Sequence, residues 1–495
     1  MKANRTPFYL VSLLVILSLL LGACSTATPT AVVTEAPSQP PTEAPAVVPP
    51  TEAPTEAAPT EAPAEAAPTE APTEAAAPET ASLTCAEPVK VGLITDVTGS
   101  LAIYGAHILR SFMLGMEYAT GAPGSAGEKF DFAVAQENTF KLDNCEFQVF
   151  VRDDQGLPDT TATVARELIE VNDVDILVGT ASSGGTATLQ GIAAENQIPL
   201  IVAPAAANDI TGANFNEYTF RVSRNNYQDA MNECAYLTKQ YKTFVQIAPD
   251  YAFGRGSAAA FRDACTLDGG TFVMDDIFAP LDTTDFTPYI QKAMDSGAEN
   301  LFLTWAGTGY VTLFQQLSDL GALEKMKVAT GFGDNASFAA VFGSAVGTIG
   351  LNVYHWSVPT NPVNDWLVKR HVEEYKEYPD LFTAGGFASA IALAEGLKKT
   401  NGDASGDAMI PALEGLKFEG PKGTYYLRPE DHVAEQPMNI LELVTLDPGK
   451  DENGINTYKF FKTVYVSEYN ELGVPCTLAG DFASRCGSLP TIPAP

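Results

Sequence analysis

A run of small, hydroxylated residues at positions 180–186 is the segment best suited to bind an anion. It reads Thr-Ala-Ser-Ser-Gly-Gly-Thr and stands where an apolar, strand-like run gives way to a helical pattern. Backbone N–H groups at a helix start, the helix dipole and a serine hydroxyl together hold carboxylates well. The same residues would also form an ordinary helix N-cap, and the loop alone does not decide between the two interpretations.

A second loop, at positions 201–208, reads Ile-Val-Ala-Pro-Ala-Ala-Ala-Asn and has no bulky side chain to block its backbone. Aromatic residues stand after other strand-like runs, namely Tyr104, Tyr251, Phe253 and Trp305. A single aromatic residue at a strand end is usually packing, whereas several indicate a flat apolar wall. Together these loops predict a site for a small carboxylate with a hydrophobic, branched or aromatic body.

The segment around Ser183 could instead imitate the nucleophile of a serine hydrolase, with His355, His371 or His432 as the base. The nucleophile pattern is imperfect, and the sequence pairs no acid with a histidine, so we favour a binding protein over an enzyme. The run at 254–258, Gly-Arg-Gly-Ser-Ala, could be mistaken for a dinucleotide-binding fingerprint. It lacks the third glycine, so we do not interpret it as a nucleotide site.

The composition argues against several other classes of protein. The 495 residues carry a formal charge of −32, whereas nucleic acid binding requires a basic face. The chain has only four histidines and no CxxC pair. We therefore expect no nucleic acid partner, no metal and no cofactor, and we interpret the acidity as a solvated surface.

The start of the chain is typical of a lipoprotein signal peptide at residues 1–23. A cationic start precedes an apolar run, which ends in Leu-Gly-Ala-Cys at 21–24 and resembles a bacterial lipobox. We expect Cys24 to be acylated and to anchor the protein to the outer face of the cell membrane. An ordinary signal peptide with an incidental cysteine is the alternative. No later stretch reaches the roughly 18 apolar residues of a spanning helix.

Residues 24–84 predict a disordered tether behind that anchor. They consist almost wholly of Pro, Thr, Glu, Ala and Val, contain no aromatic residue, and repeat Thr-Glu-Ala-Pro. Such a composition cannot build a core, and its prolines favour extended conformations.

The six remaining cysteines predict disulfides, because their number is even and the chain is exported. Two precede strand-like runs, two lie on successive helical patterns, and two flank one loop. The predicted pairs are, in that order, Cys85–Cys145, Cys234–Cys265 and Cys476–Cys486.

From about residue 85, short apolar runs alternate with amphipathic helical patterns. The first series has expected strands at 89–94, 147–151, 175–178 and 199–202 and expected helices at 105–120, 160–172 and 186–196. The second series has expected strands at 244–247, 271–273, 300–303 and 328–330. This alternation predicts two α/β, Rossmann-like doubly wound lobes. Because ligands bind beyond the carboxyl ends of such strands, the loops described above should face a cleft between the lobes.

Several segments together resemble the type I periplasmic solute-binding proteins of ABC transporters, in particular the Leu/Ile/Val-binding protein family. They are residues 91–99, 180–186, 199–208, 218–221, 250–254, 283–286 and 420–423, within a resemblance that runs from about 89 to 462. The resemblance implies a type I periplasmic-binding-protein fold that closes on its ligand and performs no chemistry. It also implies a monomer that delivers its ligand to an ABC permease in the membrane. A sensory or receptor module of the same fold is the alternative.

The same resemblance implies the lobes and the hinge. The N-terminal lobe would comprise 85–222 and 358–418, and the C-terminal lobe 223–357 and 419–490. The chain would cross between the lobes three times, near 220–223, 357–360 and 417–420.

The resemblance also implies ligand contacts. Ser183 matches the serine that binds the ligand's α-carboxylate, Tyr104 an aromatic residue of the side-chain pocket, and Asp334 lies near the acid that neutralises the ammonium. The complete set of expected contacts is Tyr104, Ser182, Ser183, Ala205, Ala207, Phe253, Trp305 and Asp334. Ala207 lacks the family's hydroxyl, Phe253 lacks a phenol, and Asn226 stands where some relatives have aspartate. These departures weaken the part of the site that would bind the ammonium group of an amino acid. The sequence therefore leaves three kinds of ligand open: an amino acid, an aromatic or aliphatic carboxylic acid, and an amide.

Overall fold

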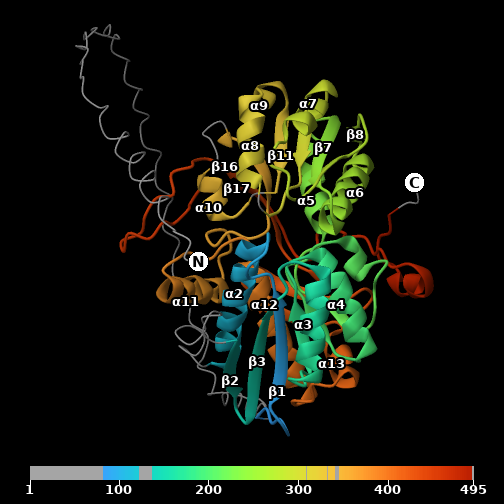
Figure 1. Ribbon diagram of the computed structural model, residues 1–495, viewed down its shortest axis with the longest axis vertical. Helices are drawn as coiled ribbons and strands as arrows, with labels where there is room; N and C mark the ends of the chain where they lie inside the picture. The colour runs from blue at the N-terminus through green and yellow to red at the C-terminus, as the bar shows by residue number, and fades with distance from the viewer. Residues whose placement is uncertain (1–81, 122–135, 308, 332, 341–344, 493–495) are drawn as a thin grey trace, which may run out of the picture. The chain divides into compact units, whose positions relative to one another are not determined.

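The fold is described from a computed structural model, for residues 82–121, 136–307, 309–331, 333–340 and 345–492 (Figure 1). The expected signal peptide, Cys24 and almost all of the expected tether lie outside these ranges. Within them, no helix combines the length and the apolar character that crossing a membrane requires.

The first sheet has the strand order β2-β3-β1-β4-β5-β6. Its strands are β1 (Val89–Thr95), β2 (Glu137–Leu142), β3 (Cys145–Asp153), β4 (Ile176–Gly179), β5 (Leu200–Val202) and β6 (Thr219–Arg221). All pairs are parallel except β2 with β3, which is antiparallel and was not predicted. The strand β2 escaped detection because its buried positions are Asn138 and Phe140, so its sequence has neither an apolar run nor an alternation of apolar with polar residues.

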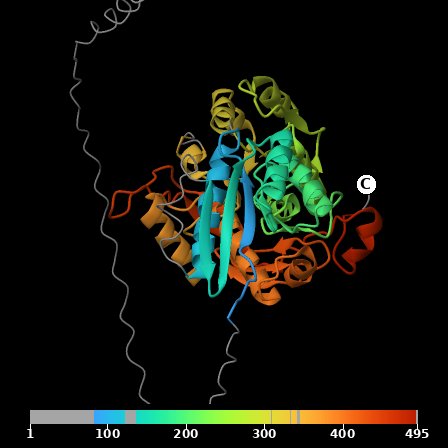
Figure 2. The ribbon, with the colours of Figure 1, turned by 60° about the horizontal axis from the view of Figure 1, so that its bottom comes forward.

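Helices cover both faces of the first sheet. They are α2 (Ala102–Thr120), α3 (Pro158–Glu170), α4 (Ser183–Glu195), α12 (Thr383–Thr400) and α13 (Gly406–Leu413). Side chains of β1 alternate between faces: Val91 and Leu93 join a core with α2 and α12, and Ile94 joins a core with α3 and α4. In Figure 2 the orange segments from late in the chain lie beside the blue and teal strands of this sheet.

The second sheet has the order β11-β10-β7-β8, with β9 also paired to β7, and all its pairs are parallel. Its strands are β7 (Thr243–Pro249), β8 (Thr271–Phe272), β9 (Ile277–Ala279), β10 (Asn300–Leu303) and β11 (Lys327–Thr330). The helices around it include α5 (Asn226–Leu237), α6 (Ala252–Leu267), α7 (Thr287–Asp295), α8 (Tyr310–Asp319) and α9 (Ala322–Lys325). The prediction of two doubly wound α/β units is therefore confirmed.

Two small antiparallel sheets complete the fold, and the sequence analysis predicted neither. One joins β12 (Ile349–Asn352), β16 (Met438–Leu443) and β17 (Phe461–Ser467). The other joins β13 (Lys417–Gly420), β14 (Gly423–Leu427) and β15 (Ala434–Glu435). The sheet of β12, β16 and β17 adds residues to the core of the second lobe, and the sheet of β13, β14 and β15 adds residues to the core of the first lobe.

The chain passes between the lobes after β6, between β12 and α11 (Pro362–Tyr375), and between β15 and β16. The third crossing differs from the one expected at 417–420. Tyr425, Leu427 and Ala434 still pack in the core of the first lobe, because the antiparallel strands β13–β15 keep this stretch on that lobe. The crossing therefore falls near Gln436, whose Nε2 donates to Val222 O (3.0 Å) in the first crossing.

The six cysteines pair as predicted. Cys85–Cys145 ties the segment before β1 to the start of β3, and Cys234–Cys265 ties α5 to α6. Cys476–Cys486 closes a loop near the end of the chain.

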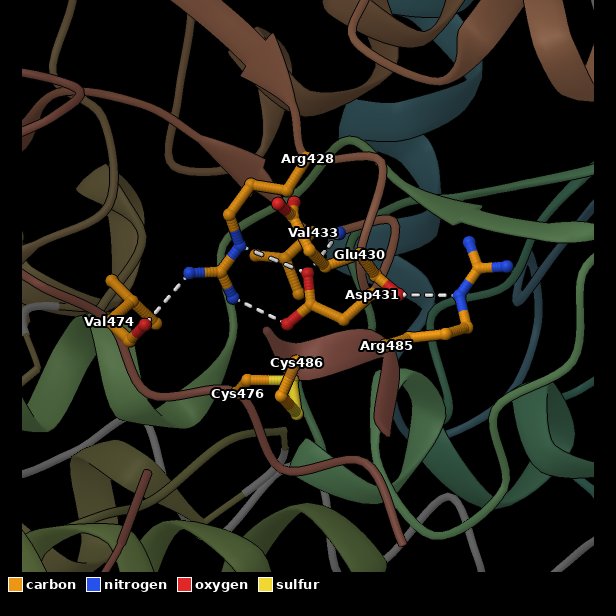
Figure 3. The surroundings of a disulfide bond; sticks show 8 residues. All are labelled: Arg428, Glu430, Asp431, Val433, Val474, Cys476, Arg485 and Cys486. Carbon is orange, nitrogen blue, oxygen red and sulfur yellow. Dashed lines mark hydrogen bonds and ion pairs between the residues drawn. A yellow bond between two sulfur atoms is a disulfide. The ribbon is translucent and has the colours of Figure 1, made fainter. Parts of the chain in front are cut away.

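That loop lies against a buried ion pair (Figure 3). The Arg428 guanidinium pairs with the Asp431 carboxylate, and both residues are 1% exposed. Arg428 Nη1 also donates to Val474 O (2.8 Å), and Arg485 Nε donates to Glu430 O (2.9 Å). These bonds fasten the C-terminal segment to the stretch just before the third crossing.

Candidate ligand-binding site

A cavity lies at the carboxyl ends of the strands of both parallel sheets. It encloses about 770 Å³, including space open to solvent at its mouth. Its lining residues follow β4, β5 and β6 in the first sheet and β7, β10 and β11 in the second. This placement agrees with the rule that open α/β sheets bind ligands beyond their strand ends.

Two adjacent serines at the start of α4 have different roles. Ser182 is the N-cap, and its hydroxyl accepts a hydrogen bond from Gly185 N (3.3 Å). Ser183 lines the cavity, and its Oγ accepts from Ala207 N (3.3 Å). Since a hydroxyl both accepts and donates, the Ser183 proton remains available for a ligand. The N-cap of α4 is thus Ser182, and Ser183 is the serine that faces the cavity.

The loop after β5 supplies the rest of this wall. Pro204, Ala205 and Ala206 line the cavity, whereas Ala207 lies behind it. The Ala207 carbonyl accepts from Arg221 Nη1 (2.6 Å), and its N–H is the donor to Ser183. Ala207 was expected to contact ligand, but its backbone instead fixes the position of Ser183.

The second lobe supplies an aromatic wall. Tyr251 and Phe253, at the start of α6, line the cavity together with Trp305 after β10. The Trp305 ring packs edge-on against Phe286, with ring centroids 4.8 Å apart, which fixes its orientation. Three of the aromatic residues considered from the sequence are therefore brought together here.

Tyr104 reaches this wall from the first lobe. Its hydroxyl accepts a hydrogen bond from Gly307 N (3.1 Å), which follows β10. Phe382, which the sequence analysis did not consider, packs edge-on against Tyr104 at 4.9 Å and also lines the cavity. Burial raises the pKa of the Tyr104 phenol, so it stays neutral.

Arg224 and Asp229 carry the charges of the cavity wall, and the sequence analysis missed both. They lie on the segment from β6 into α5, and Arg224 Nε is 3.4 Å from Asp229 Oδ2. Burial raises the pKa of Asp229 to about 6, while Arg224 opposes the rise. The strand-end rule, applied to β6, could have found Arg224. Asn226, which stands where some relatives have aspartate, does not line the cavity, and its amide donates to Phe253 O (3.2 Å).

Asp334 does not line the cavity, although it was expected to meet an ammonium group. It is the N-cap of α10 (Asn335–Ala339), and its Oδ1 accepts from Ser337 N (2.9 Å). Asp380 lies close by and accepts from Asn335 N. Burial, with the negative charge of Asp334, raises the pKa of Asp380 to about 8.

The three histidines considered as bases are buried and bonded elsewhere. His355 contacts Ser357 Oγ and Tyr458 O, and His371 contacts Glu377 O. His432 lies between Thr219 O and Glu414. Among the described residues, no histidine lines the cavity that contains Ser183. The arrangement thus gives Ser183 no histidine base.

Two α/β lobes with a cavity between their strand ends define a binding protein for small molecules. The family model described as "Periplasmic binding protein" matches residues 88–451. The chain therefore belongs to this family, as a type I periplasmic binding protein of ABC transporters.

Known proteins agree with this assignment. The Leu/Ile/Val-binding protein homolog 6 of Brucella melitensis is 25% identical over 379 residues, which cover 74% of this chain and 91% of that protein. An ABC-type branched-chain amino acid transporter from Rhodopseudomonas palustris CGA009 is 31% identical, with a TM-score of 0.65, over 79% of this chain and 100% of that one. A solute-binding protein from Rhodopseudomonas palustris BisB5, solved with 3,4-dihydroxybenzoic acid, is 24% identical, with a TM-score of 0.65, over 77% and 98%.

Proposed function

We propose that this protein is the extracytoplasmic, lipid-anchored substrate-binding subunit of an ABC importer. Its ligand is a branched-chain or aromatic amino acid or a related small carboxylate, which it delivers to a membrane permease. The observation that carries the proposal is the cavity between the two lobes, with Ser183 on one wall and Phe253 and Trp305 on the other. A hydroxyl donor facing flat apolar side chains suits a carboxylate with a hydrophobic body.

Ligand capture occurs by closure of the two lobes about the three crossings. Direct contacts join the lobes around the cavity: Tyr104 with Gly307, and Asn208 Nδ2 with Gly256 O (3.2 Å). A ligand that touches both walls favours the closed form by its differential affinity for that form. Small-angle scattering should show a more compact protein with saturating ligand, and identical curves would contradict closure.

A thermal-shift screen followed by calorimetry tests the proposed ligand class. Because a ligand that binds only the folded state stabilises it, branched or aromatic carboxylates should raise the melting temperature. At a hundred times the dissociation constant, the stabilisation is about 2.7 kcal/mol. A response to neutral sugars, with none to any carboxylate, would refute the assignment. Co-purification with a permease, rather than with a membrane receptor, separates the importer from a sensory module.

The anchor is tested at Cys24, which is the cysteine directly after the apolar run of the signal sequence. Cys24→Ala should leave the protein unprocessed or release it from the membrane fraction. Normal processing with unchanged membrane retention would show that the lipid is attached elsewhere or is absent.

A further inference from the structure

We infer that Arg224 is the charged anchor of the ligand's carboxylate, and that the ligand is a monocarboxylic acid without an α-amino group. The inference rests on the proposed function and narrows it to one class of ligand. It follows from the charges that line the cavity, from their hydrogen-bond partners and from the position of Asp334.

Arg224 is a buried cation with unused hydrogen-bonding capacity. Its residue is 5% exposed, Nη1 donates to Pro204 O (3.0 Å), and Nε faces Asp229. The guanidinium carbon lies 5.4 Å from the centre of the Phe382 ring. Within the described residues, Nη2 has no hydrogen-bond partner. A buried guanidinium requires acceptors, and its planar fork matches a carboxylate.

The positive charge and the Ser183 hydroxyl lie on the same wall. One loop holds both: Pro204 O accepts from Arg224, and Ala207 N donates to Ser183. Ser183, moreover, begins the thirteen-residue helix α4. A carboxylate on this wall therefore receives a charge-assisted bond from the arginine, a hydroxyl hydrogen bond and the favourable end of a helix dipole.

Asp229 is the one carboxylate among the described lining residues, but its surroundings are unsuited to an ammonium group. Arg224, Arg221 and Lys422 all act on it with positive charge. Burial lowers the pKa of Lys422 to about 7, so this amine is partly charged at neutral pH. An ammonium beside Asp229 would therefore be repelled by several cations, whereas a carboxylate beside Arg224 would be attracted by them.

The other nearby acids do not change this balance. Burial raises the pKa of Glu233 to about 8, so at neutral pH it is largely protonated. Asp334 lies outside the cavity lining and caps α10, as described above. Around the pair Arg224–Asp229, the buried cations Arg221 and Lys422 leave an excess of positive charge. Together with the Ser183 hydroxyl and the aromatic walls, this excess is the complement of an aryl or branched alkyl acid.

Calorimetry with matched acids and amino acids tests the inference at pH 7. The pairs are 3-phenylpropionate with L-phenylalanine, and 4-methylpentanoate with L-leucine, and benzoate is compared with its neutral amide. We expect at least one acid to bind at least tenfold more tightly than its amino acid, and benzamide to bind more weakly than benzoate.

Arg224→Gln should weaken the binding of that acid by about tenfold to a hundredfold, the usual effect of losing a charged hydrogen bond. Because this variant leaves Asp229 unpaired and could fold poorly, the double variant Arg224→Gln/Asp229→Asn removes both charges and should lose affinity equally. Arg255→Gln is the matched control, since Arg255 is an exposed arginine on α6 outside the cavity lining. It should bind as the unaltered protein does.

Each other outcome has a distinct meaning. If the amino acids bind as tightly as the deaminated acids, the inference fails while the proposed function stands. If the folded double variant binds the acid with unchanged affinity, Arg224 is not the anchor. If no acid or amino acid of the panel binds, both the inference and the proposed ligand class fail.

Discussion

The two walls of the cavity and the segments that cross between the lobes are built from different kinds of residue. Apart from the charged pair Arg224–Asp229, the walls consist mainly of small and aromatic residues at strand ends, such as Ser183, Ala205 and Trp305. Close to the crossings the chain instead buries ionised side chains that do not line the cavity, including Arg221 and the pair Arg428–Asp431. Wall residues can therefore change the affinity at little cost in stability, whereas substitutions near the crossings change the folding free energy first.

The largest effect is expected at the buried pair near the third crossing. Asp431→Ala should lower the free energy of unfolding by about 3 kcal/mol, because it leaves the buried Arg428 charge with only the more distant carboxylate of Glu435 (3.6 Å). Urea denaturation measures the loss. Glu395→Ala, which removes an exposed pair with Lys398, is the control and should cost less than about 1 kcal/mol. Equal losses in the two variants would show that the buried pair contributes no more to stability than the exposed pair does.

Ser183→Ala should act mainly on affinity. It removes a hydroxyl from the wall and should weaken carboxylate binding by about tenfold to a hundredfold. Some stability is also lost, about 1 kcal/mol, because Ala207 N loses its acceptor. Calorimetry and thermal melts separate the two effects. Thr188→Ala, on the same helix but outside the cavity lining, should leave binding unchanged.

Glu233→Gln tests a buried acid on α5, the helix that follows the first crossing, through the pH dependence of stability. Because burial raises its pKa to about 8, the folded state keeps a proton that the unfolded state has already released at pH 6. The free energy of unfolding should therefore fall as the pH rises, by roughly 2 kcal/mol between pH 6 and 8 from this group. The variant should lose that part of the dependence, and the difference between the two stability curves measures it. Identical curves would show that Glu233 ionises normally.

Tyr104→Phe should have the smallest effect. It removes the acceptor of a hydrogen bond from Gly307 N, which joins the lobes beside the cavity. A neutral hydrogen bond contributes about 0.5–1.5 kcal/mol, so affinity should fall about twofold to tenfold while the ligand preference stays unchanged. A changed order of ligands would place the Tyr104 hydroxyl on the ligand rather than on the closing contact.

The sequence predicts those parts of the molecule that local patterns determine. Apolar runs such as 89–94 and 300–303 became central strands, and Ser183, Phe253 and Trp305 met because each follows a strand end. Local patterns did not reveal Arg224 and Asp229 as a cavity pair, because their position depends on how the chain passes from β6 to α5. Local patterns also did not reveal that Asp334 is an N-cap, because that role depends on where α10 begins.

The third crossing was misplaced for a related reason. Strands β13–β15 are short and pair with one another, so their sequence does not reveal which lobe they join. These strands belong to the first lobe because Phe418, Tyr425 and Leu427 pack into the same core as α2 and α12. Such a contact between distant parts of the chain has no local signature.

The packing of α2 against α12 also constrains the order of folding. The helices touch so closely that a Cβ atom at Gly115 would lie 2.7 Å from Phe387 O and from Ala390 Cβ. During synthesis α2 is made long before α12, and the part of its surface that packs against α12 stays uncovered until the chain has grown past residue 383. The second lobe also depends on residues made late, because β12 pairs with β16, and β16 with β17. Neither lobe is therefore complete when its own parallel sheet has been made, and a chain that stops before β16 leaves the core of the second lobe incomplete.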